Sequence, residues 1–183
     1  MAVPPRQSKQ PVSPLAGTYG HPFHPILVTV PIGAWVTSLV FDVASRIVGD
    51  PGFLYRGSVW LIAVGVAGAV VAATAGFLDL LVVPVGTPAF RTALWHMSIN
   101  LGVTAAYAVG FAWRLGGYDR PGAVGVAQIA LSVISLGGLA ISGYLGGMLA
   151  YRYGVRVADE VTQAEGFAGR DDLGAPNRIS SEG

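Results

Sequence analysis

The chain contains three histidines, and their placement marks where its chemistry is to be expected. His21 and His24 stand three residues apart, where a polar, proline-rich stretch meets a long apolar segment. His96 lies near the start of a later apolar segment, and Asp79 lies near the end of the segment before it. Neutral imidazole is a ligand for haem iron, copper and zinc, and a carboxylate can join it. These four residues are therefore the candidate site.

Three interpretations of these residues are open. In the first, His24 and His96 are the axial ligands of a haem b between helices, and the chemistry is one-electron transfer. Asn100, one turn beyond His96, or Asp79 then orients an imidazole through its second nitrogen. In the second, the three histidines His21, His24 and His96 bind copper or zinc, and Asp79 joins them. In the third, the histidines are structural, and His96 bonds Asp79 across helices.

Composition assigns the chain to the membrane proteins. Of its 183 residues, 52% are hydrophobic and only 11% are charged, whereas a soluble domain has about 25% charged residues. The net charge of +1 provides no basic field that would attract nucleic acid. The absence of cysteine excludes disulfides, iron–sulfur clusters and c-type haem attachment. No Walker loop, HExxH or G-x-S-x-G motif is present, so the sequence does not indicate an enzyme.

Four apolar segments predict an all-α fold, an integral membrane four-helix bundle with up-down topology. Each segment has the ~20 residues that cross a ~30 Å hydrocarbon core. The predicted spans are about 25–48, 58–81, 91–113 and 123–150. Residues 1–20 are predicted to be a disordered N-terminal tail, 21–156 the four-span domain, and 157–183 a disordered C-terminal tail. In this topology all four candidate residues lie on the side of the termini, and a slight excess of Lys and Arg there favours cytoplasmic termini.

Helical spacing predicts two further contacts. Asp42 and Arg46 are four residues apart near the end of the first span, the spacing of a same-face ion pair. Gly65, Gly68 and Ala72 share one face of the second span, so another helix is expected to approach closely there.

Two motifs resemble those of a known family. Residues 24–33 (HPILVTVPIG), with Asp42 near the end of the same helix, resemble the opening motif of the DUF2231 family of predicted bacterial integral membrane proteins. Residues 146–157 (GGMLAYRYGVRV) resemble its closing motif. His96 and Asn100 stand where the family tends to carry a histidine on its third helix.

The resemblance covers about residues 18–157 and implies a four-span protein embedded in the lipid bilayer of the bacterial cytoplasmic (inner) membrane. Some relatives are joined to Rieske-type redox domains, which favours electron transfer. This chain has no cysteine for a Rieske cluster, so a redox partner would be another polypeptide. It also departs from the closing motif at Arg156, where the family commonly has glycine, which bears on whether the chain turns tightly there.

The leading prediction is therefore a small membrane protein that binds haem b through His24 and His96 and transfers electrons to or from a redox partner. The alternatives are a non-enzymatic structural or accessory subunit of a membrane complex, and a histidine-based metal transporter or sensor. A homo-oligomer is compatible with each of them.

Overall fold

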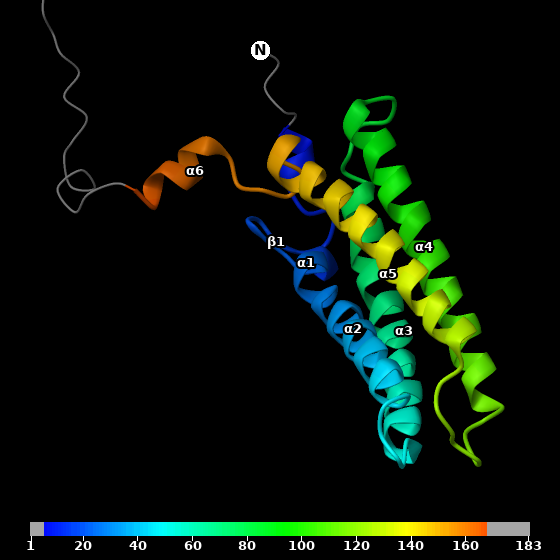
Figure 1. The fold of residues 1–183 in the computed structure, drawn as a ribbon. Helices are drawn as coiled ribbons and strands as arrows, with labels where there is room; N and C mark the ends of the chain where they lie inside the picture. The colour runs from blue at the N-terminus through cyan, green and yellow to red at the C-terminus, as the bar shows by residue number, and fades with distance from the viewer. Residues whose placement is uncertain (1–5, 168–183) are drawn as a thin grey trace, which may run out of the picture.

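The computed structural model describes residues 6–167, and four long helices make up most of this part of the chain (Figure 1). They are α2 (Thr29–Ala44), α3 (Gly52–Leu80), α4 (Pro88–Leu115) and α5 (Val126–Gly147). The shorter elements are η1 (Arg6–Lys9), η2 (Pro14–Ala16), β1 (Gly17–Thr18), β2 (His21–Pro22), α1 (His24–Leu27), the π-helical turn η3 (Met148–Arg152) and α6 (Glu160–Glu165). Each predicted apolar segment overlaps one of the long helices.

Proline and threonine determine where two of these helices begin. The hydroxyl oxygen of Thr87 accepts a hydrogen bond from the backbone N–H of Phe90 at 3.1 Å, and Pro88 occupies the first helical position, where its missing N–H costs nothing. The first apolar segment is divided into α1 and α2. Pro31 accounts for the break, because it has no N–H to donate to the carbonyl of Leu27.

The helices pack through a core of large side chains placed against small ones. Helix α2 lies against α3 and α5, and α4 also lies against α3 and α5. Trp35 of α2 stacks on Tyr107 of α4, with ring centroids 4.2 Å apart. A Cβ atom on Gly65 would overlap the indole of Trp35, and one on Gly68 would lie 2.8 Å from a methyl carbon of Val30. The close approach predicted for this glycine face of α3 is confirmed.

The outer surface of the helices is apolar, as the membrane prediction requires. Large side chains such as Trp60, Val64, Ile134 and Ile141 are exposed. Three segments are long and apolar enough to cross a membrane: His24–Ala44, Gly52–Leu80 and Val126–Arg152. Within residues 6–167, α4 is the one long helix that is not among these three segments. It is long enough to cross but less apolar, because it carries polar side chains such as His96 and Asn100. The protein is therefore mainly helical with three candidate spans, and a fourth span and the up-down topology stay predictions.

The N-terminal segment differs from the tail predicted over residues 1–20. Within the described residues it forms η1, η2 and a small hairpin in which Thr18 of β1 pairs with His21 of β2. Lys9 and Ala16 are buried, and the ammonium group of Lys9 donates to the carbonyls of Val157 and Ala158 at 3.4 Å each. Residues 8–18 are held in place by a segment about 140 residues later in the chain, so the sequence composition of the tail alone gave no sign of the contact.

The chain turns sharply where α5 and η3 end. Gly154 and Arg156 both adopt left-handed backbone conformations, with φ of 66° and 60°. Beyond this turn the predicted C-terminal tail contains the short helix α6, which stands away from the long helices in Figure 1. Residues 1–5 and 168–183 of the two predicted tails lie outside the described residues.

Candidate functional site

His24 of α1 and His96 of α4 lie together near the end of the molecule that carries the N-terminal segment. Their ring centroids are 6.0 Å apart, and the ring planes are nearly perpendicular, at 86°. Both imidazoles are half-buried. The two residues are 72 positions apart in the sequence, so their proximity depends on how α1 and α4 are placed by α3 and α5.

Helix α3 fixes the ring of His24. Its Nδ1 atom lies 2.9 Å from the carbonyl oxygen of Ala72. The ring also lies directly over Gly76, one turn further along the same helix, where an added Cβ would be 2.8 Å from Nδ1. Ala72 and Gly76 belong to the same small-residue face of α3 against which α2 packs. This face therefore orients the imidazole of His24 and also allows the close contact between the two helices.

Helix α5 fixes the ring of His96 in a similar way. Its Nδ1 atom lies 2.8 Å from the carbonyl oxygen of Ser142, and an added Cβ on Gly146 would be 3.1 Å from the ring. The hydroxyl of Ser142 lies 3.0 Å from Nδ1 and donates to the backbone carbonyl of His96 at 3.1 Å. The amide nitrogen of Asn100 lies 3.2 Å from Nε2 and also donates to the carbonyl of His96 at 3.0 Å.

These contacts determine the tautomer of both rings. A carbonyl oxygen can only accept a hydrogen bond, so the Nδ1 atoms of His24 and His96 must carry the protons. In the neutral form of each ring Nε2 is then the lone-pair nitrogen, the form in which imidazole binds a metal. A histidine that ligates a metal almost always donates its other ring N–H to a carbonyl, carboxylate or water, and both residues have this arrangement.

The other two candidate residues have their contacts outside this pair. Asp79 is in an ion pair with Arg156, whose Nε lies 2.7 Å from the carboxylate. The predicted bond between Asp79 and His96 is wrong, because the partners of His96 are Ser142 and Asn100. His21 is exposed on the hairpin, and its Nδ1 lies 3.4 Å from the carbonyl of Tyr19.

The part of the chain that the structure describes brings together two histidines and no third acidic or imidazole ligand. Within residues 6–167, no group of three or more His, Asp or Glu side chains is arranged to hold a metal ion. The structure therefore brings together two histidines, His24 and His96, with Asn100 and Ser142 beside His96.

A buried ion pair toward the other end of the helices was not anticipated. Nη2 of Arg114 lies 2.5 Å from Oδ2 of Asp42, and the two side chains are 1% and 0% exposed. The hydroxyl of Ser58 also donates to Asp42, and Nη2 of Arg114 donates to the hydroxyl of Ser132 at 3.2 Å. This network joins α2, α3, α4 and α5. It holds the helices together rather than forming an open site.

The ion pair predicted between Asp42 and Arg46 is wrong. Asp42 points from α2 toward the other long helices and pairs with Arg114, whereas Arg46 lies beyond the end of α2 and is exposed. Arg46 instead donates from Nη1 to the carbonyl of Val124 at 2.9 Å. One feature of the sequence could have identified the true partner of Asp42. Arg114 stands at the end of the third apolar segment, which in an up-down bundle lies on the same side of the membrane as the end of the first.

Arg156 is the second residue whose role the sequence did not reveal. Its side chain is 3% exposed and pairs with Asp79. The chain does turn tightly there although arginine replaces the glycine expected from the motif. A left-handed conformation costs a non-glycine residue about 1–3 kcal/mol, so the buried contacts of the guanidinium must offset that strain.

A family model described as a predicted membrane protein (DUF2231) matches residues 20–159. The match includes both histidines of the pair, the buried ion pair and Arg156. No curated protein and no solved structure matches the chain. Because the family model covers most of the 183 residues, the chain belongs to the DUF2231 family of predicted membrane proteins.

Proposed function

We propose that the protein is a small b-type cytochrome in which His24 and His96 are the axial ligands of one haem. The observation that carries the proposal is the separation of the two imidazoles, whose ring centroids are 6.0 Å apart. A metal–imidazole bond is about 2 Å long, so two imidazoles on opposite sides of one iron have ring centroids roughly 6 Å apart. When bound, haem iron accepts and returns one electron.

The number of available ligands favours haem over a zinc or copper site. A porphyrin supplies four nitrogens, so the protein needs to add only two, whereas tetrahedral zinc requires three or four protein ligands. The pair of His24 and His96 supplies two, and Asp79 is engaged by Arg156. A histidine-based metal transporter or sensor is therefore the weaker candidate.

The contacts of each imidazole support the same function. Hydrogen bonds to Ala72 and Ser142 hold the protons on Nδ1 and direct the lone pairs to Nε2. Asn100 must release Nε2 of His96 for an iron to bind there, and its other contact, with the carbonyl of His96, does not involve the ring.

The proposed setting is the bacterial cytoplasmic membrane. Three segments have the length and composition of spans, and α4 packs between two of them, against α3 and α5. We place α4 across the bilayer as a fourth span, with the four helices alternating in direction. Both termini and the histidine pair then lie on one side, which the charge distribution favours as the cytoplasmic side. With no cysteine in the chain, its electron donor and acceptor are other molecules.

The haem content of three histidine variants tests the proposal. We expect purified wild-type protein to carry about one haem b per chain, measured as the pyridine haemochrome against protein concentration. His24→Ala and His96→Ala should each lose most of this haem, because one axial ligand alone holds the group weakly. His21→Ala is the matched control and should retain it, since His21 is exposed on the hairpin.

Two outcomes would contradict the proposal. A wild-type protein that stays colourless after expression with haem supplied would leave the histidine pair as a packing contact and favour an accessory subunit. Equal haem loss in His21→Ala would mean that the ligands are not the pair assigned here.

A further inference from the structure

We propose that Arg156 is a positioning residue for His24, acting through a set of contacts that we call the Arg156 clamp: Arg156, Asp79 and the carbonyls of Lys9, Ala16 and Thr18. The inference deepens the proposed function, because it assigns the residue that holds one haem ligand in place. The placement of His24 by the clamp can nevertheless be tested without any haem.

The guanidinium of Arg156 is buried, and each of its three nitrogens donates a hydrogen bond. Its Nε atom donates to Asp79 at 2.7 Å. Its Nη2 atom donates to the carbonyl of Ala16 at 3.0 Å and of Thr18 at 3.4 Å, and Nη1 donates to the carbonyl of Lys9 at 3.4 Å. The fork of arginine can bond several acceptors at fixed angles, which the point charge of lysine cannot do. One side chain thus ties the N-terminal segment to the end of α3.

The two surfaces that the clamp joins are the two that hold His24. The carbonyl of Ala16 accepts from Arg156 and also from the backbone N–H of Phe23, at 3.1 Å, and Phe23 directly precedes His24 at the start of α1. On the other surface, Asp79 lies one turn beyond Gly76, over which the ring of His24 is packed. The clamp therefore fixes the backbone before His24 and the helix beneath its ring.

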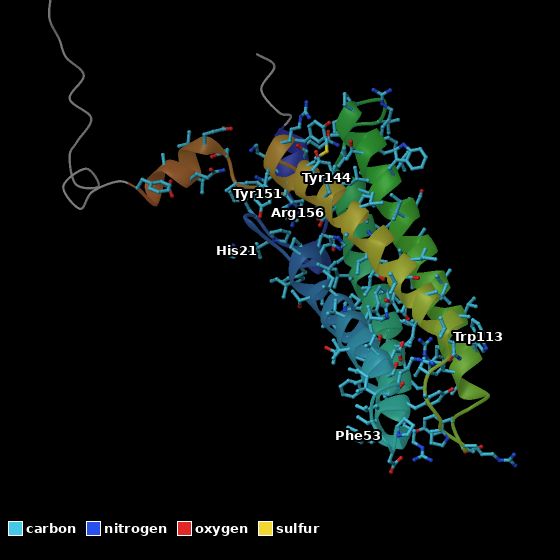
Figure 2. All side chains as sticks on the ribbon, viewed as in Figure 1. His21, Phe53, Trp113, Tyr144, Tyr151 and Arg156 are labelled. Carbon is cyan, nitrogen blue, oxygen red and sulfur yellow. The ribbon has the colours of Figure 1, made fainter. Side chains whose placement is uncertain are left out.

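The backbone conformation of Arg156 allows the effect of its side chain to be tested without changing the turn. Its φ of 60° is a conformation that glycine adopts without strain. Arg156→Gly should therefore keep the turn while removing the guanidinium, so a change at His24 in this variant reports the clamp. Figure 2 shows Arg156 at the end of the molecule that carries the His21 hairpin, while Phe53 and Trp113 lie toward the other end of the helices.

The reactivity of each imidazole toward diethyl pyrocarbonate tests the inference directly. The experiment uses the full-length protein in detergent after any bound haem has been extracted and its absence verified by visible absorption, with modification at each histidine followed by mass spectrometry. In Arg156→Gly we expect the rate at His24 to rise roughly tenfold, as its contact with Ala72 is lost more often. The rate at His96 should not change, because α5 holds that ring, and exposed His21 should react quickly in every variant.

Two further variants complete the design. Asp79→Asn combined with Arg156→Gly leaves no unpaired buried charge and should show the same rise at His24, which attributes the effect to lost positioning rather than to an isolated carboxylate. Arg152→Ala removes an exposed arginine from the same end and should leave all three rates unchanged.

The inference is overturned if the rate at His24 in Arg156→Gly stays within about twofold of the wild type while helix content is retained. It is also overturned if His24 and His96 become reactive together, since that would report general loosening. Because every variant is compared free of haem, these results do not depend on whether the wild type binds haem.

Discussion

Replacement of Arg114 by methionine is expected to destabilise the protein by about 3–5 kcal/mol, because it leaves the carboxylate of Asp42 buried without its cationic partner. The measurement is the free energy of unfolding in mixed detergent micelles, followed by helix content. Arg46→Met is the matched control. It removes the arginine at the helical spacing from Asp42, but Arg46 is exposed and makes no ion pair with it, so the change should be small.

A double variant distinguishes an unpaired charge from lost packing. Asp42→Asn combined with Arg114→Met leaves no buried charge, so most of the lost stability should return. If Arg114→Met costs no more than Arg46→Met, or if the double variant is as unstable as Arg114→Met alone, the ion pair does not hold the helices together as described.

Replacement of Gly65 by alanine is expected to cost about 1–3 kcal/mol, because its Cβ would overlap the indole of Trp35. The indole is buried and stacked on Tyr107, so it cannot move away from Gly65 without disturbing that stack. The same unfolding measurement checks this prediction.

Gly137→Ala provides the comparison for this substitution. Gly137 also lies inside a long helix, but a Cβ there would meet nothing within 4 Å. Alanine favours the helix over glycine, so Gly137→Ala should be neutral or slightly stabilising. A similar loss of stability in both variants would show that the Gly65 face is not a tight helix contact.

The sequence allowed the long helices to be located because the signals that define them are local. Apolar segments of about 20 residues and the pair Thr87-Pro88 appear directly in the chain. The close packing at Gly65 and Gly68 could also be predicted, because their spacing places them on one helix face. The break before α2 follows from Pro31 alone.

Pairs between distant segments could not be read in this way. Spacing within one helix suggested Arg46 as the partner of Asp42, whereas the partner is Arg114, which is 72 positions away and on another helix. The composition of residues 6–20 is that of a disordered tail. Part of that segment is nevertheless held in place, because the guanidinium of Arg156 donates hydrogen bonds to the carbonyls of Lys9 and Ala16. In both cases the deciding contact is an interhelical or end-to-end hydrogen bond, which leaves no periodic pattern.

The candidate site was partly predictable from local sequence and partly dependent on contacts between distant segments. The positions of His24 and His96 at the starts of the first and third apolar segments placed them on one side of the predicted bundle. The contacts with Ala72 and Ser142, which fix the tautomers, involve backbone carbonyls and so have no side-chain signature. Asp79 was an apparent ligand by position, and only the structure shows that Arg156 engages it.

The measurement that tests the central claim most directly is the visible spectrum of purified wild-type protein, reduced minus oxidised, combined with near-infrared magnetic circular dichroism of the oxidised form. We predict a low-spin b-type spectrum with the charge-transfer band of two imidazole ligands, from one haem per chain. Absence of haem, or a haem whose ligands are not a pair of imidazoles, would contradict the assignment of His24 and His96 as its axial ligands.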